Sequence, residues 1–162
     1  MSGADLAVRE VLTYPAPILK ERARPASPDE AEATLVDLRD TMAAHDRCVG
    51  IAAPQIGVAL RVAVVDISAH PHGKDSHGLI ELVNPEVAHA SEGTKVSREG
   101  CLSLPDLTAN VRRPRRATVE TGGRTYEVSG FEARCVLHEI DHLDGILFLD
   151  RVASVTDDIF RR

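Results

Sequence analysis

The feature that most constrains this chain is the run His138-Glu139-Ile140-Asp141-His142 near its C-terminal end. Residues four positions apart lie on one face of an α-helix, so both imidazoles would reach one metal ion if this stretch is helical. The flanking residues predict such a helix, because Ser129 and Glu132 have the spacing of a capping box and Gly145 stands where a left-handed C-terminal cap belongs. The sequence therefore predicts a helix with a metal site. An exposed helix with two chance histidines is the alternative.

The third ligand distinguishes between classes of metallohydrolase. In the metzincin pattern HExxHxxGxxH a third histidine follows, but Phe148 occupies that position here. The sequence after His142 contains no His, Glu or Cys, so we expect the third ligand upstream. Cys101 is the best candidate, and Cys48 and Cys135 are weaker ones. A thiolate with two imidazoles suits a borderline or soft divalent ion and leaves one coordination position open.

The rest of the chain predicts an α+β fold, with short and mostly antiparallel strands packed around the central HExxH-bearing helix. Ser27-Pro28-Asp29-Glu30 predicts a helix start, and the apolar spacing of Ala31, Leu35, Leu38 and Met42 extends this helix to about His45. Gly122-Gly123 is typical of a hairpin turn. We expect a loop over 46–57, a strand or turn over 146–149, and strands over 61–67, 79–83, 86–89, 95–98, 117–121 and 124–128.

Length and composition limit the possible functions. The 162 residues are 43% hydrophobic and 27% charged, which predicts one globular domain over 1–162 with a short tail from about residue 150. The net charge of −6 and the five aromatic residues argue against DNA as a partner. No membrane partner is expected, because no stretch approaches 18 apolar residues. Residues 1–10 lack the pattern of a secretory signal, and three cysteines form no paired framework, so a cytoplasmic protein is expected.

Three blocks of this sequence resemble the signature motifs of peptide deformylases, in the family's order. They are 50–55 (GIAAPQ), 99–103 (EGCLS) and 138–142 (HEIDH), and the similarity extends over about residues 8–152. The resemblance implies that Cys101, His138 and His142 hold the metal, which is Fe²⁺ in the family and replaceable by Zn²⁺, Ni²⁺ or Co²⁺. It also implies that Glu139 is the general base and acid, and that the side-chain amide of Gln55 and the backbone N–H of Leu102 stabilise the oxyanion.

The activity implied by the resemblance is removal of the N-formyl group from the N-terminal methionine of new polypeptides, giving formate and a free amine. The helix places Phe131, Cys135 and His138 on one face, which would form one wall of an apolar slot for methionine. The expected substrate contacts are Val49, Gly50, Glu99, Gly100, Phe131 and Cys135. An amidohydrolase acting on a small N-formyl metabolite is the main alternative, and a non-catalytic binding module or a metalloprotease has less support.

The sequence departs from the family pattern at three places. Cys48 stands where a glycine is usual, Leu137 stands where a glutamine is usual, and the segment 112–137 is short. Cys48 would narrow the substrate groove, which favours the metabolite alternative. Its side chain is expected to point away from that of Val49.

Two clusters in the sequence offer further hypotheses. Four arginines, Arg112, Arg113, Arg115 and Arg116, are interpreted first as a solvated loop, and contact with ribosomal RNA near the nascent chain is the alternative. The histidines at 70, 72 and 77 are interpreted as part of a polar loop rather than as a second metal site.

Overall fold

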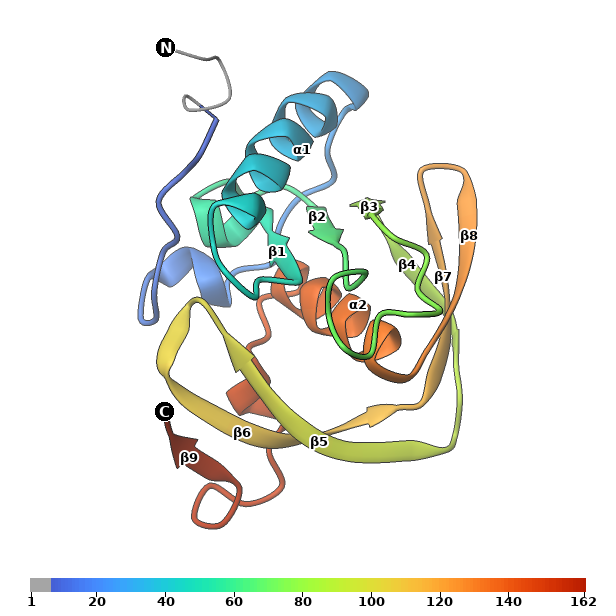
Figure 1. Cartoon of the computed structure of the whole chain (residues 1–162). Coiled ribbons are helices and arrows are strands. Elements are labelled where there is room, and N and C mark those ends of the chain that lie inside the picture. Colours follow the sequence, from blue (N-terminus) through green and yellow to red (C-terminus); the bar gives the residue numbers. More distant parts are fainter. Residues whose placement is uncertain (1–6) are drawn as a thin grey trace.

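The computed structural model describes residues 7–162 and shows an α+β fold (Figure 1). Expectations that concern residues 1–6, such as the missing secretory signal, lie outside the described residues. Two α-helices are present in the described part, α1 (Pro28–Ala43) and α2 (Gly130–Leu143), together with the 3₁₀-helices η2 (Pro17–Lys20), η3 (Ala53–Ile56) and η4 (Phe148–Arg151). The strands are β1 (Gly50–Ala52), β2 (Val62–Val65), β3 (Ile80–Val83), β4 (Glu86–Ala90), β5 (Thr94–Cys101), β6 (Leu104–Pro114), β7 (Arg116–Thr121), β8 (Arg124–Ser129) and β9 (Ile159–Arg161).

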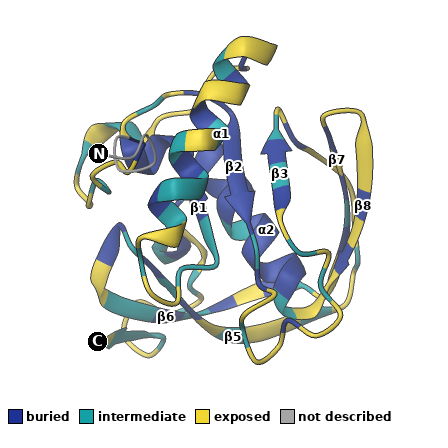
Figure 2. Ribbon diagram, turned by 45° about the horizontal axis from the view of Figure 1, so that its top comes forward, coloured by how far each residue is buried: buried dark blue, intermediate teal, exposed yellow. Residues whose placement is uncertain are grey.

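Three small sheets surround α2. Their strand orders are β1-β2-β3, β4-β7-β8 and β5-β6-β9, and all these neighbours pair antiparallel. Figure 1 shows α2 in the middle of the three sheets, and Figure 2 shows that it is mostly buried. The predicted architecture, with antiparallel strands around a central helix, is confirmed. Within residues 7–162, no helix combines the length and the apolarity that crossing a membrane would require.

The predicted start of helix α1 is confirmed. Ser27 accepts a hydrogen bond from the Glu30 N–H, and the Glu30 carboxylate accepts one from the Ser27 N–H, which completes a capping box. The buried stripe differs from the predicted one. Thr34 and Thr41 are buried beside Ala31 and Leu38, whereas the predicted Leu35 and Met42 are only half-buried. Threonine fits there because its hydroxyl finds a partner: that of Thr34 donates to the Glu30 carbonyl at 2.8 Å.

The prediction of a capping box at the start of α2 is wrong. The Ser129 side chain makes no capping bond. The Glu132 carboxylate is held instead by His77, from the backbone N–H at 2.8 Å and by Nδ1 at 2.6 Å. The predicted end is confirmed, since Gly145 has φ +75°. A Cβ at Gly145 would lie 2.7 Å from the Lys20 carbonyl oxygen. The close approach of the Lys20 backbone therefore also requires glycine at this position.

The sequence missed three strands, of which β6 is the longest. β6 pairs with β5 from Thr94↔Pro114 to Cys101↔Leu104, so the arginine-rich stretch forms the end of β6 and the start of β7 rather than a loop. β1 and η3 lie within the predicted loop 46–57, and β9 lies within the predicted tail. The predicted strand or turn at 146–149 leads into η4.

Candidate metal centre

Two elements bring three potential ligands together. α2 contributes His138 and His142, and the end of β5 contributes Cys101 at an irregularity in the β5–β6 register. One ligand atom of each residue lies within 4.8 Å of the other two. Cys101 Sγ lies 3.4 Å from His142 Nε2. The expected upstream partner of the two histidines is thus present in a single cluster with them.

The other two cysteines lie outside this cluster. Burial raises the pKa of Cys48 to about 12, and its thiol donates a hydrogen bond to the Gly50 carbonyl at 3.3 Å. Burial also raises the pKa of Cys135, which lies on the same helix as the histidines. A thiol whose pKa is raised stays protonated near neutral pH and is a poor ligand. Cys48 and Cys135 are therefore the weaker candidates in the structure as well.

Glu99 orients one of the histidine ligands. Its Oε1 lies 2.8 Å from His138 Nδ1, and its carboxylate also accepts hydrogen bonds from Arg113 at 2.6 and 2.9 Å and from Arg134 at 2.7 Å. Burial alone would raise the pKa of Glu99, but the hydrogen bonds from His138 and Arg113 hold it well below its ordinary value. An ionised Glu99 keeps a proton on Nδ1 and leaves Nε2 of His138 available as a ligand. The Glu99 carboxylate is fully engaged, so a substrate would meet this residue through its backbone.

Glu139 is buried beside the cluster. Its Oε1 has no hydrogen-bond partner among residues 7–162, and burial raises the pKa of Glu139 to about 7. Gly50 in β1 lies directly against it, since a Cβ at Gly50 would be 2.8 Å from Glu139 Oε2. Any other residue at position 50 would displace this carboxylate. A buried carboxyl group whose pKa lies near neutrality can both accept and return a proton.

The donor set fits a divalent transition-metal ion. Burial lowers the pKa of His142 well below its ordinary value, so this imidazole is neutral and has a lone pair for a ligand bond. Its Nδ1 has no partner among the described residues, as Glu139 Oε1 has none. Sulfur and imidazole nitrogen are ligands for zinc or iron rather than for magnesium or calcium, which prefer oxygen.

A cleft of about 1070 Å³ opens onto the cluster. Its walls include all the predicted substrate contacts, namely Val49, Gly50, Glu99, Gly100, Phe131 and Cys135, and also Gln55 and Leu102. Val49 and Phe131 pack against the apolar cluster that contains Cys135, whereas Cys48 packs against a different cluster next to α1. Val49 and Cys48 therefore pack on different apolar clusters, although both line the cleft.

The amide of Gln55 is held in one orientation. Its Oε1 accepts a hydrogen bond from the Ala52 N–H at 3.0 Å, and its Nε2 lies 3.1 Å from Ser103 Oγ and 3.5 Å from Cys101 Sγ. The N–H groups of this amide therefore face the metal cluster. This is the arrangement that a donor to a developing oxyanion requires.

Sequence reasoning missed several residues of the site. The His70 ring stacks on the Phe131 ring with a centroid distance of 4.3 Å and extends the cleft wall. Arg162, which follows β9, also lines the cleft. No periodic pattern in the sequence points to either residue. Arg113 was placed in a basic surface cluster, but it is only 3% exposed and forms ion pairs with Glu99 and Asp141, so that assignment is wrong.

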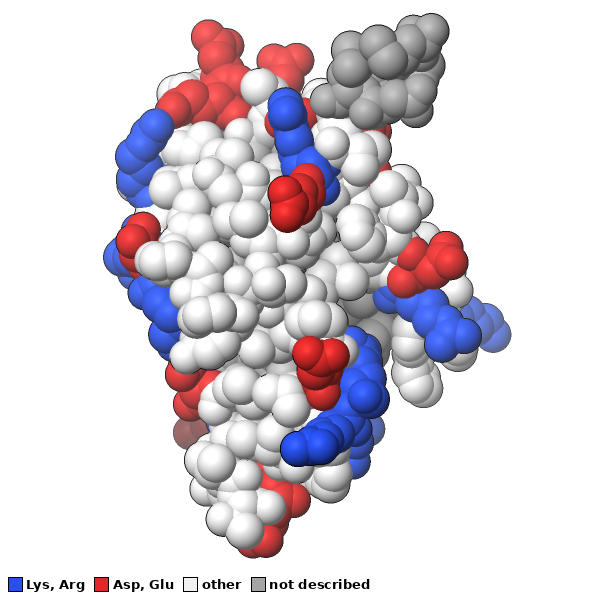
Figure 3. All heavy atoms as spheres, turned by 90° about the vertical axis from the view of Figure 1, so that its left-hand side faces the viewer, with Lys and Arg blue, Asp and Glu red and all other residues white. Residues whose placement is uncertain are grey.

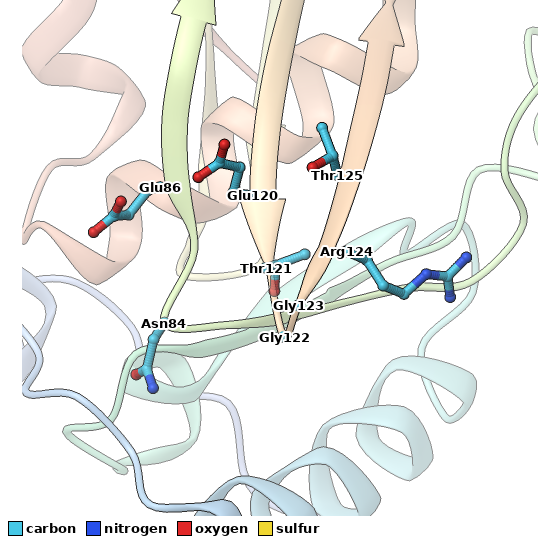
Figure 4. Close-up of a pocket in the computed structure, with 8 residues that line it drawn as sticks. All are labelled: Asn84, Glu86, Glu120, Thr121, Gly122, Gly123, Arg124 and Thr125. Atoms are coloured by element: carbon cyan, nitrogen blue, oxygen red, sulfur yellow. The ribbon is translucent and has the colours of Figure 1, made fainter.

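A second hollow, of about 360 Å³, lacks the histidine and cysteine side chains of the metal cluster. It lies at the β7–β8 hairpin (Figure 4) and is lined by Asn84, Glu86, Glu120, Thr121, Gly122, Gly123, Arg124 and Thr125. None of these lining residues is a histidine or a cysteine. The Asn84 side chain is used structurally, because it bonds the backbone N–H and carbonyl of Ala26 at 2.8 and 3.0 Å. We therefore place the functional site at the cleft over α2.

A buried Cys–His–His cluster beside an unpartnered glutamate in an HExxH helix defines a metal-dependent hydrolase. Comparison with known proteins narrows the class. The sequence model of the polypeptide deformylase family matches residues 8–158, so the chain belongs to this family. The peptide deformylase of Heliobacterium modesticaldum is 45% identical over 92% of this chain and 97% of the relative.

Solved structures of peptide deformylases have the same fold. The Thermotoga maritima enzyme superposes with a TM-score of 0.79 and 31% identity, covering 91% of this chain and 99% of that one. The Acinetobacter baumannii enzyme, solved with Met-Ala-Ser bound, gives a TM-score of 0.76 and 37% identity over 90% of this chain and 98% of that one. The resemblance identified from the three sequence motifs is confirmed.

Proposed function

We propose that this protein removes the N-formyl group from the N-terminal methionine of newly made polypeptides, releasing formate and a free amine. The observation that carries the proposal is the convergence of Cys101, His138 and His142 beside the buried Glu139 at the base of the cleft. Family membership supports the same activity. A cleft of about 1070 Å³ has room for several residues of peptide, which disfavours a small formylated metabolite as the substrate.

Cys101, His138 and His142 would hold one divalent ion, for which we propose Fe²⁺, with Zn²⁺, Ni²⁺ or Co²⁺ able to replace it. When bound, such an ion supplies Lewis-acid stabilisation of negative charge and makes water acidic enough to be deprotonated near neutral pH. The donor set does not distinguish among these four ions. Metal analysis of protein purified without oxygen would identify the native one.

The protein's own residues would carry the remaining steps. Glu139 accepts the proton of the attacking water and returns it to the leaving amine, because it is buried beside the ligands and its Oε1 has no other partner among the described residues. Gln55, whose amide faces the cluster, and the backbone N–H of Leu102 donate hydrogen bonds to the formyl oxygen as negative charge develops there. Loss of one such donor typically costs about 10²–10³ in rate.

The apolar part of the cleft would bind the methionine side chain. Val49 and Phe131 pack on one apolar cluster with Cys135, and together they form a slot beside the ligands. Gly50 in β1 and Gly100 in β5 both line the cleft, where a substrate backbone would pair with them. In the Acinetobacter relative the bound peptide is Met-Ala-Ser, the deformylated form of such a substrate. We propose the same mode of binding here.

We further propose that the chain acts as one catalytic domain in the cytoplasm and meets nascent chains at the ribosome. Arg112, Arg115 and Arg116 are exposed and remain the predicted contacts with ribosomal RNA, whereas Arg113 is buried. Figure 3 shows one face of the molecule, on which small groups of positive and negative side chains lie next to one another among uncharged areas. The proposed contact with RNA rests on these three exposed arginines.

Formate release from formyl-Met-Ala-Ser by protein loaded with iron in the absence of oxygen tests the proposed function. We expect turnover that disappears in a chelator and returns with added metal. Formylated small molecules such as formyl-methionine amide serve as the comparison. Faster turnover of the small molecules than of the peptide would favour the metabolite alternative, and no turnover of either would contradict a hydrolase function.

A further inference from the structure

Strand β9 brings one arginine to the mouth of the cleft. β9 pairs with β6 through Phe160↔Thr108 and Arg161↔Leu107, and the Arg162 N–H donates to the Asp106 carbonyl at 2.9 Å. Side chains hold this strand as well. The Arg98 guanidinium lies over the Phe160 ring, 3.6 Å from its centroid. The backbone that carries Arg162 is therefore fixed on the sheet rather than loose at its edge.

The Arg162 guanidinium lies against Gly100. A Cβ at Gly100 would be 2.8 Å from Arg162 Nη2 and 3.3 Å from its Cζ. Gly100 directly precedes the ligand Cys101, and all three residues line the cleft. Arg162 therefore reaches across β6 to the substrate-facing strand β5, one residue away from the metal cluster.

The Arg162 guanidinium forms no ion pair with a side chain among the described residues. Among residues 7–162, no carboxylate lies within ion-pair distance of the Arg162 guanidinium, and the same holds for Arg98 on the same wall. Glu99 is the one carboxylate on this wall, and Arg113 and Arg134 already neutralise it. The remaining acidic side chains at the mouth, Asp46 and Asp66, come from loops on the β1–β2 side.

We propose that Arg162 is a specificity residue that binds a carboxylate in the first two residues after formyl-methionine. This inference rests on the proposed function. With the formyl group at the cluster and the methionine in its slot, the rest of the peptide leaves the cleft past Gly100 and Arg162. A guanidinium presents paired N–H donors that match a carboxylate. The carboxylate is either an aspartate side chain or the free C-terminus of a very short formyl peptide.

The test compares isosteric substrates within one enzyme preparation, so that metal content cancels. The first pair is formyl-Met-Asp-Ser-amide and formyl-Met-Asn-Ser-amide, and a second pair places Asp or Asn one residue later. A third pair, formyl-Met-Ala as free acid and as amide, isolates the terminal carboxylate. We expect kcat/KM to favour the acidic member of a side-chain pair about two- to fivefold, mainly through KM, and to lose this preference as salt rises.

Two variants assign the effect to the residue. Arg162→Gln should abolish the preference and Arg162→Glu should reverse it. Arg161→Gln is the matched control, because it removes the same charge from the adjacent position, whose side chain points to the opposite face of β9. Arg161→Gln should keep the preference of the unmodified protein.

The outcomes separate this inference from the proposed function. If the peptides are deformylated and the Asp and Asn members react equally, the role of Arg162 is refuted and the deformylase function stands. A preference confined to the free-acid pair would assign Arg162 to peptide termini and refute the side-chain form. A preference that persists in Arg162→Glu would also refute the proposal. If no formyl peptide is hydrolysed by metal-loaded protein, the proposed function itself fails.

Discussion

At the scale of single residues, the chemistry depends on one carboxyl group. Glu139→Ala should reduce kcat by about 10²–10⁴, because no other side chain at the cluster is placed to transfer the proton. The variant should still bind one metal per chain and keep its fold, since Glu139 is not among the three ligands. Metal analysis and formate release measured on the same sample check this prediction. Near-normal turnover by metal-loaded Glu139→Ala would contradict it.

The methionine slot gives a second prediction at this scale. Val49→Asp should abolish the preference for formyl-Met over formyl-Ala peptides, because a charged group would stand in an apolar wall. The preference in the unmodified protein should be about tenfold or more, since each buried methylene contributes about 0.8 kcal/mol. Cys48→Gly is the adjacent control and should retain the preference, because Cys48 packs on the other apolar cluster. Equal losses in both variants would show that the slot lies elsewhere.

At the scale of elements, the start of α1 predicts a dependence on pH. Hydrogen bonds from Arg24 and the Ser27 backbone lower the pKa of Glu30 from 4.5 to about 2. A carboxyl group with a lower pKa in the folded state stabilises the fold above its unfolded pKa, and this contribution is lost as the pH falls towards the folded value.

Glu30→Gln should therefore reduce the free energy of unfolding near pH 7 and make little difference near pH 2. Urea unfolding of both proteins between pH 2 and 7 measures this difference. Glu32→Gln, elsewhere on the same helix, is the control for the loss of one negative charge. A Glu30→Gln effect that is constant across this range would show that the carboxylate bonds are not responsible.

The elements also show how far the sequence alone could lead. Helix α1, the hairpin at Gly122-Gly123 and the C-terminal cap at Gly145 were predicted, because caps and turns act within a few residues. The start of α2 was predicted with the wrong partners, because Glu132 bonds His77, which is 55 positions away. β6 was missed because buried and exposed positions alternate along it, but both kinds of position carry arginine. Arg113 is buried and Arg112 is exposed, and the prolines of this strand also argue against a strand in the sequence.

The same distinction holds for the site. The two histidine ligands come from one helical turn, and the lack of a ligand after His142 pointed upstream to Cys101. Arg162 and His70 reach the cleft through pairing and stacking between distant segments. Local sequence carries no signal for such contacts, so only the structure could show them.

At the scale of the whole molecule, the metal should stabilise the fold. Cys101 lies in the β5-β6-β9 sheet and the histidines lie in α2, so an ion would join two structural layers. A ligand at one hundred times its Kd stabilises the folded state by about 2.7 kcal/mol. For a chain of this size that should raise Tm by about 5–10 °C.

Thermal unfolding with metal and with chelator measures this stabilisation. Cys101→Ser should abolish the difference between the two conditions, whereas Cys135→Ser, at a cysteine outside the cluster, should keep it. A Tm that is the same with and without metal in the unmodified protein would contradict the assignment of the cluster.

The buried charges around Glu99 have a consequence for how such a protein can be recombined. Glu99 on β5 binds Arg113 on β6 and Arg134 on α2, and Asp141 on α2 binds Arg113 and Arg151 on η4. A chimeric gene joined anywhere between codons 114 and 133 would take the two halves of this network from different parents. The charged residues of each half would then face residues that come from the other parent. Crossovers in this interval should yield folded proteins only when both parents carry the same charges, while crossovers in the region encoding α1 should be tolerated more widely.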